Sequence, residues 1–281
     1  MNAATESETT TMTVGSPVES TRNEQLHQLA QELLSATESL VPVAPLRDRL
    51  EDMSLEDAYV IQTLQLDKHV ADGRVLAGRK VGLTSLAMQQ QLGVDSPDFG
   101  FFFTDMVHHD GDSIPASSFI SPKVEPEFGF VLKETLQGPG VTLEQATAAI
   151  GEVYAAIEII DSRVSDWDIK LVDTVADNAS CGAIVVGTTP LAVDPAALNE
   201  VSCALTIDGT TLGTGTGADV MGNPVAPLAW LANVLGEQGV SLEAGQLILP
   251  GSFTKAEPVT AGSSATADFG ALGSLTINFS K

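Results

Sequence analysis

Two glutamates, Glu125 and Glu127, stand one residue apart in the segment 122–132, whose apolar tail predicts a β-strand. Residues two apart on a strand project from the same face, so these carboxylates are expected side by side. Two like charges on a buried strand repel each other and lose hydration, and a bound cation would relieve both costs. The pair therefore suggests metal chemistry.

A third carboxylate, Glu158, lies inside the apolar run 155–160, where an unpaired charge is rare. Three oxygen ligands without a Cys or His are typical of a hard divalent ion such as Mg²⁺ or Mn²⁺. The residues also allow a second interpretation, in which Glu125 and Glu127 form a solvated strand edge with Pro126 between them. Spacing alone leaves both interpretations open.

Two further segments have residue types suited to an anionic substrate. Residues 78–85 combine Lys80 with glycines that let a ligand approach the backbone, although a lone lysine more often faces solvent. Residues 173–182 form a polar stretch between apolar ones. That stretch is either a turn rich in Asx hydrogen bonds or a loop that presents Asn178 and Ser180 to a substrate carboxylate.

Two other motifs are not assigned a function. The adjacent pair His108 and His109 would point to opposite sides of a strand, so a solvated turn is favoured over a metal site. The glycines of 213–217 lack the spacing of a dinucleotide-binding loop. The dipeptide 208–209, Asp-Gly, predicts a hairpin turn, and we expect the glycines in the loop after it.

The composition excludes several function classes. The formal charge of −24, with only 13 basic residues in 281, argues against nucleic acid as a partner. No apolar stretch approaches the roughly 18 to 20 residues of a membrane span, and the first residues lack the pattern of a signal peptide. We expect a cytoplasmic protein without membrane partners. Among so few cations, Lys80, Lys123 and Arg163 stand in motif-like surroundings.

Periodicity divides the chain into three parts and predicts an α+β fold. Residues 1–22, rich in Ser, Thr and Glu, predict a disordered extension, residues 23–75 a helical section, and residues 76–281 a β-rich catalytic domain. Ser54 and Thr142 begin capping-box patterns, and a further helix is expected over 226–238. Strands are expected at 79–83, 128–132, 157–160, 183–186, 203–207, 247–249 and 274–279.

Five of these segments, in order, resemble the fumarylacetoacetate hydrolase superfamily, and the resemblance runs from about residue 24 to the end. They are 78–84 (Gly-Arg-Lys-Val-Gly-Leu-Thr), 91–100 (Gln-Leu-Gly-Val-Asp-Ser-Pro-Asp-Phe-Gly), 122–127 (Pro-Lys-Val-Glu-Pro-Glu), 156–163 (Ala-Ile-Glu-Ile-Ile-Asp-Ser-Arg) and 172–182 (Val-Asp-Thr-Val-Ala-Asp-Asn-Ala-Ser-Cys-Gly). The groups most similar are the 2-oxopent-4-enoate hydratases and the 4-oxalocrotonate decarboxylases.

The resemblance implies a mixed, β-rich fumarylacetoacetase C-terminal-like fold and a homo-oligomer. It implies that the three glutamates hold the divalent metal and that Ser180 lies near the substrate carboxylate. Lys80 and Asp98 would lie beside the substrate as acid–base groups. A hydratase of this group adds water at C4 of 2-hydroxypenta-2,4-dienoate and gives 4-hydroxy-2-oxopentanoate in aromatic meta-cleavage catabolism. Arg163 is expected to brace the metal loop.

Three alternatives stand beside the hydratase. A decarboxylase would remove CO₂ from a 2-oxo-hexenedioate, and residues 138–140 (Gly-Pro-Gly) are also familiar from that group. Decarboxylase relatives tend to have an apolar residue at the position of Asp98, so the hydratase is favoured. An acylpyruvase-type hydrolase would need a catalytic His that is not evident. A metal-binding partner subunit without turnover should have lost Lys80 or a glutamate, and this chain retains them.

Overall fold

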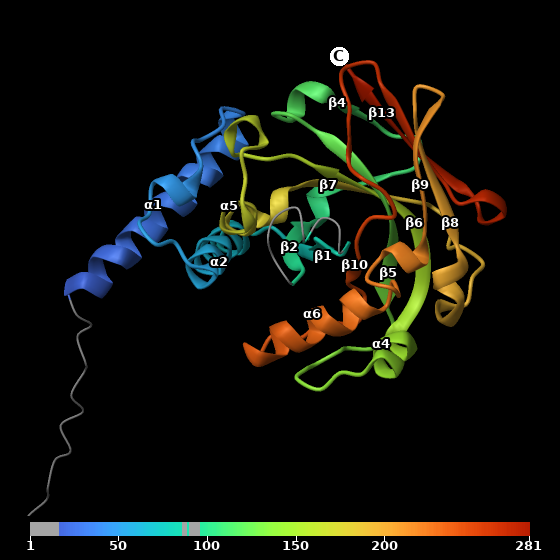
Figure 1. Ribbon diagram of the computed structural model, residues 1–281, viewed down its shortest axis with the longest axis horizontal. Coiled ribbons are helices and arrows are strands. Elements are labelled where there is room, and N and C mark those ends of the chain that lie inside the picture. The colour runs from blue at the N-terminus through green and yellow to red at the C-terminus, as the bar shows by residue number, and fades with distance from the viewer. Residues whose placement is uncertain (1–16, 86–88, 90–95) are drawn as a thin grey trace, which may run out of the picture.

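The computed structural model describes residues 17–85, 89 and 96–281 (Figure 1). Residues 1–16 of the predicted extension and residues 91–95 of the second motif lie outside the described residues. The extension was expected to reach residue 22, but helix α1 spans Pro17–Ser39 and begins earlier. Proline is well tolerated in the first turn of a helix, where its missing N–H has no intrahelical partner. Within the described ranges, no helix is both long and apolar enough to cross a membrane.

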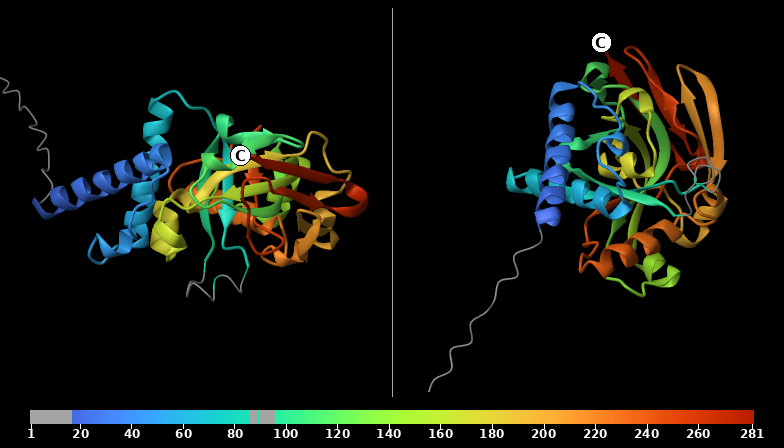
Figure 2. Two further views of the ribbon diagram at one scale, coloured as in Figure 1. Left: turned by 90° about the horizontal axis from the view of Figure 1, so that it is seen from above. Right: turned by 60° about the vertical axis from the view of Figure 1, so that its left-hand side comes forward.

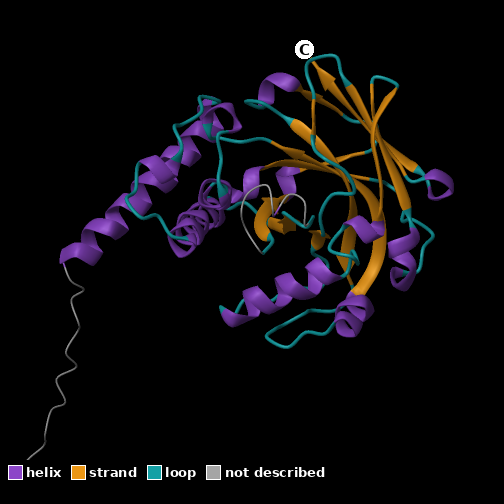
Figure 3. Ribbon diagram, in the orientation of Figure 1, coloured by secondary structure: helices purple, strands orange, loops and turns teal. Residues whose placement is uncertain are grey.

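Two β-sheets form the centre of the molecule (Figure 3). The first has the order β2-β1-β10-β5-β6-β7-β3, with β11 paired to β5, and the second has the order β4-β13-β12-β8-β9. The strands of the first sheet are β1 (Leu76–Gly82), β2 (Asp98–Phe103), β3 (Val107–His109), β5 (Lys123–Leu132), β6 (Ile150–Ile160), β7 (Cys181–Val186), β10 (Leu247–Leu249) and β11 (Glu257–Pro258). Those of the second are β4 (Ser113–Pro115), β8 (Ser202–Ile207), β9 (Thr210–Thr216), β12 (Ser264–Asp268) and β13 (Ser274–Ser280).

The main hydrophobic core lies between these sheets. It joins Phe128 of β5 and Ile157 of β6 to Leu205 of β8 and Ile277 of β13, and α6 (Ala226–Glu237) packs into the same cluster through Leu228. Side chains alternate along a strand, so the core takes one face of β5 and β6 and leaves Glu125, Glu127 and Glu158 on the other. The candidate site therefore lies on the face of the first sheet turned away from the main core.

The helical section lies at one side of the sheets, where α1 and α2 (Leu55–Ala71) are neighbours (Figures 1 and 2). Ser54 caps α2 in a capping box with Asp57, and Thr142 caps α4 (Leu143–Ala149) in one with Gln145, so both patterns are confirmed. A second core cluster joins Leu33 of α1 and Ile61 of α2 to Val175 of α5 (Leu171–Ala176). The helical section and the β-rich part thus share buried contacts.

Two local expectations were wrong. Gly213 and Gly215 lie within β9, the return strand of the hairpin that turns at Asp208, and not in the loop after it. A Cβ at Gly215 would lie 2.1 Å from the carbonyl oxygen of Phe253, so this glycine admits a close backbone approach rather than a loop. The first part of the stretch expected as a turn or loop at 173–182 belongs to the short helix α5, which buries Val175 against the helical section, and only the residues after α5 form a turn.

Candidate active site

Three carboxylates converge on the face of the first sheet away from the core. Glu125 of β5 is the direct partner of Glu158 on β6, and Glu127 pairs with Ala156 two positions along the same ladder. Pro126 sits opposite Ile157 without breaking the register. One ligand oxygen from each glutamate lies within 4.8 Å of the other two. Glu127 is 1% exposed and Glu125 is only partly exposed, so the solvated strand edge considered for Glu125 and Glu127 is ruled out; Glu158 is 0% exposed.

The protein compensates little of this negative charge. Within the described part of the chain, neither carboxylate oxygen of Glu158 has a hydrogen-bond partner, although the Nζ atom of Lys80 forms an ion pair with Glu158 at 3.2 Å. Glu127 accepts one hydrogen bond, 2.8 Å long, from the backbone N–H of Gly251. Burial raises the pKa of Glu127 and Glu158, and burial with the nearby Glu158 raises that of Glu125 to about 7. These orphaned buried oxygens fit a hard divalent cation.

Lys80 and Asp98 are brought together by the pairing of β1 with β2. Asp98 is the register partner of Gly82, and a Cβ at Gly82 would lie 2.2 Å from the Oδ1 atom of Asp98 and 3.3 Å from the Nζ atom of Lys80. Only glycine leaves room for both groups there. Burial raises the pKa of the Asp98 carboxyl. Burial also opposes the charge of Lys80, but the adjacent Glu158 and Asp98 outweigh it and raise the pKa of the ammonium.

Ser180 reaches the same cavity from a strained turn. Asn178, Ala179 and Ser180 have φ values of 54°, 50° and 55°, a left-handed run that costs free energy in residues other than glycine. The Oγ atom of Ser180 is 3.3 Å from Oγ1 of Thr174 on α5. Buried Asp177 precedes the run, and its ion pair with Arg163 fixes the turn. Such strain at a buried position is characteristic of a functional site.

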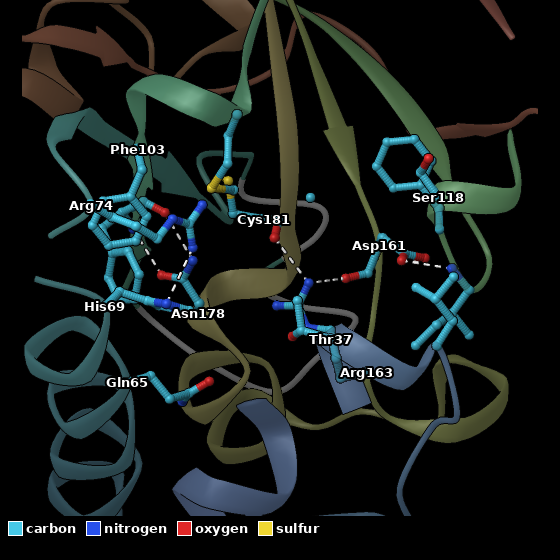
Figure 4. A pocket seen from close by; sticks show the side chains of 16 residues that line it. Thr37, Gln65, His69, Arg74, Phe103, Ser118, Asp161, Arg163, Asn178 and Cys181 are labelled. Carbon is cyan, nitrogen blue, oxygen red and sulfur yellow. Dashed lines mark hydrogen bonds between the residues drawn. The ribbon is translucent and has the colours of Figure 1, made fainter. Parts of the chain in front are cut away.

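Arg163 acts as the brace that the sequence suggested, although on the turn rather than on a metal ligand. Its guanidinium donates to the carboxylate of Asp177 and, through Nη1, to the backbone carbonyls of Asp161 and Cys181 at 2.6 and 2.9 Å (Figure 4). Burial raises the pKa of Asp177 to about 6, although Arg163 opposes this shift. The arginine thereby ties the end of β6 to the start of β7.

The structure places Asn178 away from the other predicted site residues. Its side chain lies beside a different cavity, together with His69 and Arg74 (Figure 4). The amide makes two 2.8 Å hydrogen bonds with the backbone of Phe101, accepting from its N–H and donating to its carbonyl. Instead of the expected contact with a substrate carboxylate, the Asn178 side chain connects the strained turn to β2 by hydrogen bonds.

A cavity of about 350 Å³ joins most of the predicted site residues. It is lined by Lys80, Asp98, Glu125, Glu127 and Ser180. Sequence reasoning gave no role to three other lining residues, namely Lys123, Trp167 and Thr174. Lys123 could have been predicted as a site residue, because it stands two residues before Glu125 on the same strand and therefore on the same face. Trp167 and Thr174 come from the segment between β6 and β7, whose path the sequence pattern did not reveal.

Comparisons with known proteins bear on this arrangement. The family model described as "Fumarylacetoacetate (FAA) hydrolase C-terminal" matches residues 69–280. A protein of Paraburkholderia xenovorans named "2-keto-4-pentenoate hydratase" is 42% identical over 256 residues, which cover 91% of this chain and 95% of that protein. A Comamonas testosteroni protein named "2-hydroxyhexa-2,4-dienoate hydratase" is also 42% identical, covering 89% and 96%. The solved 4-oxalocrotonate decarboxylase of Pseudomonas putida G7, complexed with magnesium and adipate, has a TM-score of 0.88 at 33% identity, covering 92% and 98%.

Proposed function

Because the chain belongs to the fumarylacetoacetate hydrolase family, we propose that it is a metal-dependent hydratase of 2-hydroxypenta-2,4-dienoate, which it converts to 4-hydroxy-2-oxopentanoate. The observation that carries this choice is Asp98, whose buried carboxylate lies beside Lys80 in the cavity that Glu125 and Glu127 line. Adding water to an alkene needs a group that takes a proton from water, and Asp98 supplies one there. Relatives that are 42% identical are named as hydratases of such dienoates.

The three glutamates would hold Mg²⁺ or Mn²⁺, which would supply Lewis-acid chemistry to a 2-oxo acid substrate. Lys80 keeps its proton on Nζ because Glu158 and Asp98 raise its pKa, so it serves as a cationic hydrogen-bond donor to the substrate. The Oδ1 atom of Asp98 receives no hydrogen bond from the described residues and is free to accept a proton from the attacking water. Ser180, with Thr174 beside it, presents a hydroxyl to the substrate carboxylate.

The experiment supplies the purified protein and Mg²⁺ with freshly generated 2-hydroxypenta-2,4-dienoate, and in a parallel reaction with 2-oxo-3-hexenedioate. We expect loss of the dienoate absorbance, a product that contains one oxygen from H₂¹⁸O at C4, and no activity after exhaustive chelation. Release of CO₂ from the hexenedioate without hydration of the dienoate would replace the proposal by the decarboxylase. Undiminished hydration after chelation would remove the metal from it.

The decarboxylase is the second candidate because the solved decarboxylase superposes with a TM-score of 0.88. The cytoplasmic location and the assembly into a homo-oligomer remain parts of the proposal. Analytical ultracentrifugation of the purified protein tests the assembly, and a monomer at assay concentration would remove it.

A further inference from the structure

Lys123 is a cation of the cavity that has no ion-pair partner among residues 17–85, 89 and 96–281. It lies at the start of β5, on the same face as Glu125 and about 7 Å from it along the strand. Its side chain is half-buried and lines the 350 Å³ cavity. Among the residues that the structure describes, none forms a hydrogen bond or ion pair with its ammonium, whereas the ammonium of Lys80 is already paired with Glu158.

Trp167 holds this ammonium in place. The Nζ atom of Lys123 lies 4.0 Å from the centroid of the Trp167 ring, a distance typical of a cation–π contact. The indole N–H donates a 3.0 Å hydrogen bond to the carbonyl of Ser121, which orients the ring. Asp166 and Trp167 have φ values of 57° and 55°, so the backbone accepts a left-handed conformation to place the indole there.

The segment beneath the indole is itself fixed. Asp161, the residue that follows β6, accepts hydrogen bonds from the backbone N–H groups of Ile120 and Ser121, at 2.8 and 2.6 Å. Ser121 is thus held from one side by Asp161 and from the other by Trp167. These contacts define the place from which β5 starts and restrict where Lys123 can project.

The charges of the cavity show why such a cation matters. Asp98, Glu125 and Glu127 line it, and a carboxylate oxygen of Glu158 lies within 4.8 Å of one from each of the two glutamates. An anionic substrate therefore enters a cavity surrounded by negatively charged groups. A divalent ion would neutralise only part of that charge. A cation that the protein leaves unpaired, half-buried and fixed on an aromatic ring can pair with an incoming anion at little further cost in side-chain entropy.

We propose that Lys123 binds a carboxylate of the substrate, with Trp167 as the positioning residue that holds the ammonium. This inference rests on the proposed function and extends it to the substrate-binding groups. The carboxylate is either the C1 group common to all 2-oxo acids or a second one at the far end of a diacid. Both have the same chemistry, and the two arms of the experiment below distinguish them.

The test measures binding of two unreactive analogues, 2-oxopentanoate and 2-oxohexanedioate, to the Mg²⁺-loaded protein by calorimetry. In Lys123→Met we expect about a tenfold to hundredfold weakening, the size of a lost charge-assisted hydrogen bond. Weakening of both analogues identifies the C1 carboxylate, and weakening of the diacid alone identifies the distal one. Dissociation constants within twofold of the parent for both analogues would overturn the inference.

Three further variants exclude a purely structural effect. Lys133→Met removes the same charge from an exposed position just beyond the other end of β5 and should leave binding unchanged. Lys123→Arg should retain most of the affinity, and Trp167→Leu should lose part of it without changing affinity for Mg²⁺. If Lys133→Met weakened analogue binding as much as Lys123→Met, the effect would be due to the net charge of the protein. If Trp167→Leu bound the analogues as the parent does, Trp167 would have no positioning role.

The outcome separates this inference from the proposed function. A parent protein that fails to hydrate the dienoate, yet binds the analogues in a manner that depends on Lys123, refutes the hydratase and leaves the carboxylate site standing. An active parent whose Lys123→Met variant binds both analogues normally, with an unchanged KM, refutes only the carboxylate site. Should Lys123→Met fail to fold, Lys123→Gln retains a polar head and gives the same comparison.

Discussion

The glutamate trio places function in conflict with stability. Glu125 and Glu158 face each other across two paired strands, and like charges in that position destabilise a sheet. Burial of Glu127 and Glu158 adds a desolvation cost, which the ion pair between Lys80 and Glu158 offsets in part. The raised pKa values of the three carboxyls have this physical origin. A bound divalent ion would stabilise the folded chain as well as activate the substrate.

Replacing Glu127 by Gln is therefore expected to affect the two states differently. The metal-free variant should be at least as stable as the parent, because one buried charge is gone and the side-chain oxygen can still accept from Gly251. The parent should gain stability with Mg²⁺, by about 2.7 kcal/mol at a hundredfold excess over Kd, and the variant should gain almost none. Thermal unfolding with and without Mg²⁺, at matched ionic strength, measures both effects.

Glu134→Gln is the matched control, since Glu134 is exposed just beyond the end of β5. It should respond to Mg²⁺ as the parent does. A Glu127→Gln variant that is stabilised by Mg²⁺ as strongly as the parent would contradict the assignment of this carboxylate as a ligand. Loss of the folded state in that variant would contradict the claim that the carboxylate serves the metal rather than the fold.

At the scale of elements, the sequence predicted what depends on local periodicity. The alternation in β5 put Glu125 and Glu127 on one face, and the apolar run of β6 predicted a buried Glu158. Asn178 was assigned to the substrate because a polar stretch between apolar ones indicates a functional loop. Such a stretch does not show in which direction each side chain points. Its partner Phe101 is 77 residues away, and no local pattern encodes that contact. The left-handed φ values of Asn178, Ala179 and Ser180 could not be predicted from the local sequence either.

Asn178→Ala tests the role of this turn. Both hydrogen bonds to the buried backbone of Phe101 are lost, and alanine tolerates the left-handed conformation less well than asparagine. We expect the free energy of unfolding to fall by about 1 to 3 kcal/mol in urea titrations. Turnover should also fall, because the same turn carries Ser180, while affinity for Mg²⁺ stays unchanged.

Asn199→Ala provides the comparison, since Asn199 donates a single exposed hydrogen bond to the carbonyl of Gly222. Its stability should lie within about 0.5 kcal/mol of the parent. If Asn178→Ala kept full stability but weakened binding of a substrate analogue, the original interpretation of Asn178 as a substrate contact would be restored.

At the scale of the whole molecule, the boundary expected at residue 75 does not separate two independent cores. Leu33 and Ile61 of the helical section share a buried cluster with Val175 of α5. The Nη1 atom of Arg47, between α1 and α2, pairs with Asp173 of α5 at 2.6 Å, and the backbone N–H of Arg47 donates to the same carboxylate. Since α5 leads directly into the turn that carries Ser180, the helical section supports the active site.

This coupling predicts the behaviour of Arg47→Met. The side chain of Asp173 is 0% exposed, so removing its partner leaves a buried carboxylate with only backbone donors. We expect a loss of about 3 kcal/mol, with far-UV circular dichroism and tryptophan fluorescence following one transition. Arg49→Met, which breaks the more exposed pair with Glu32, should cost less than about 1 kcal/mol. The double variant Arg47→Met with Asp173→Asn removes the buried, unpaired charge and should therefore recover part of the lost stability. Unfolding of the helical section before the rest of the chain would show instead that the helical section is a separate domain.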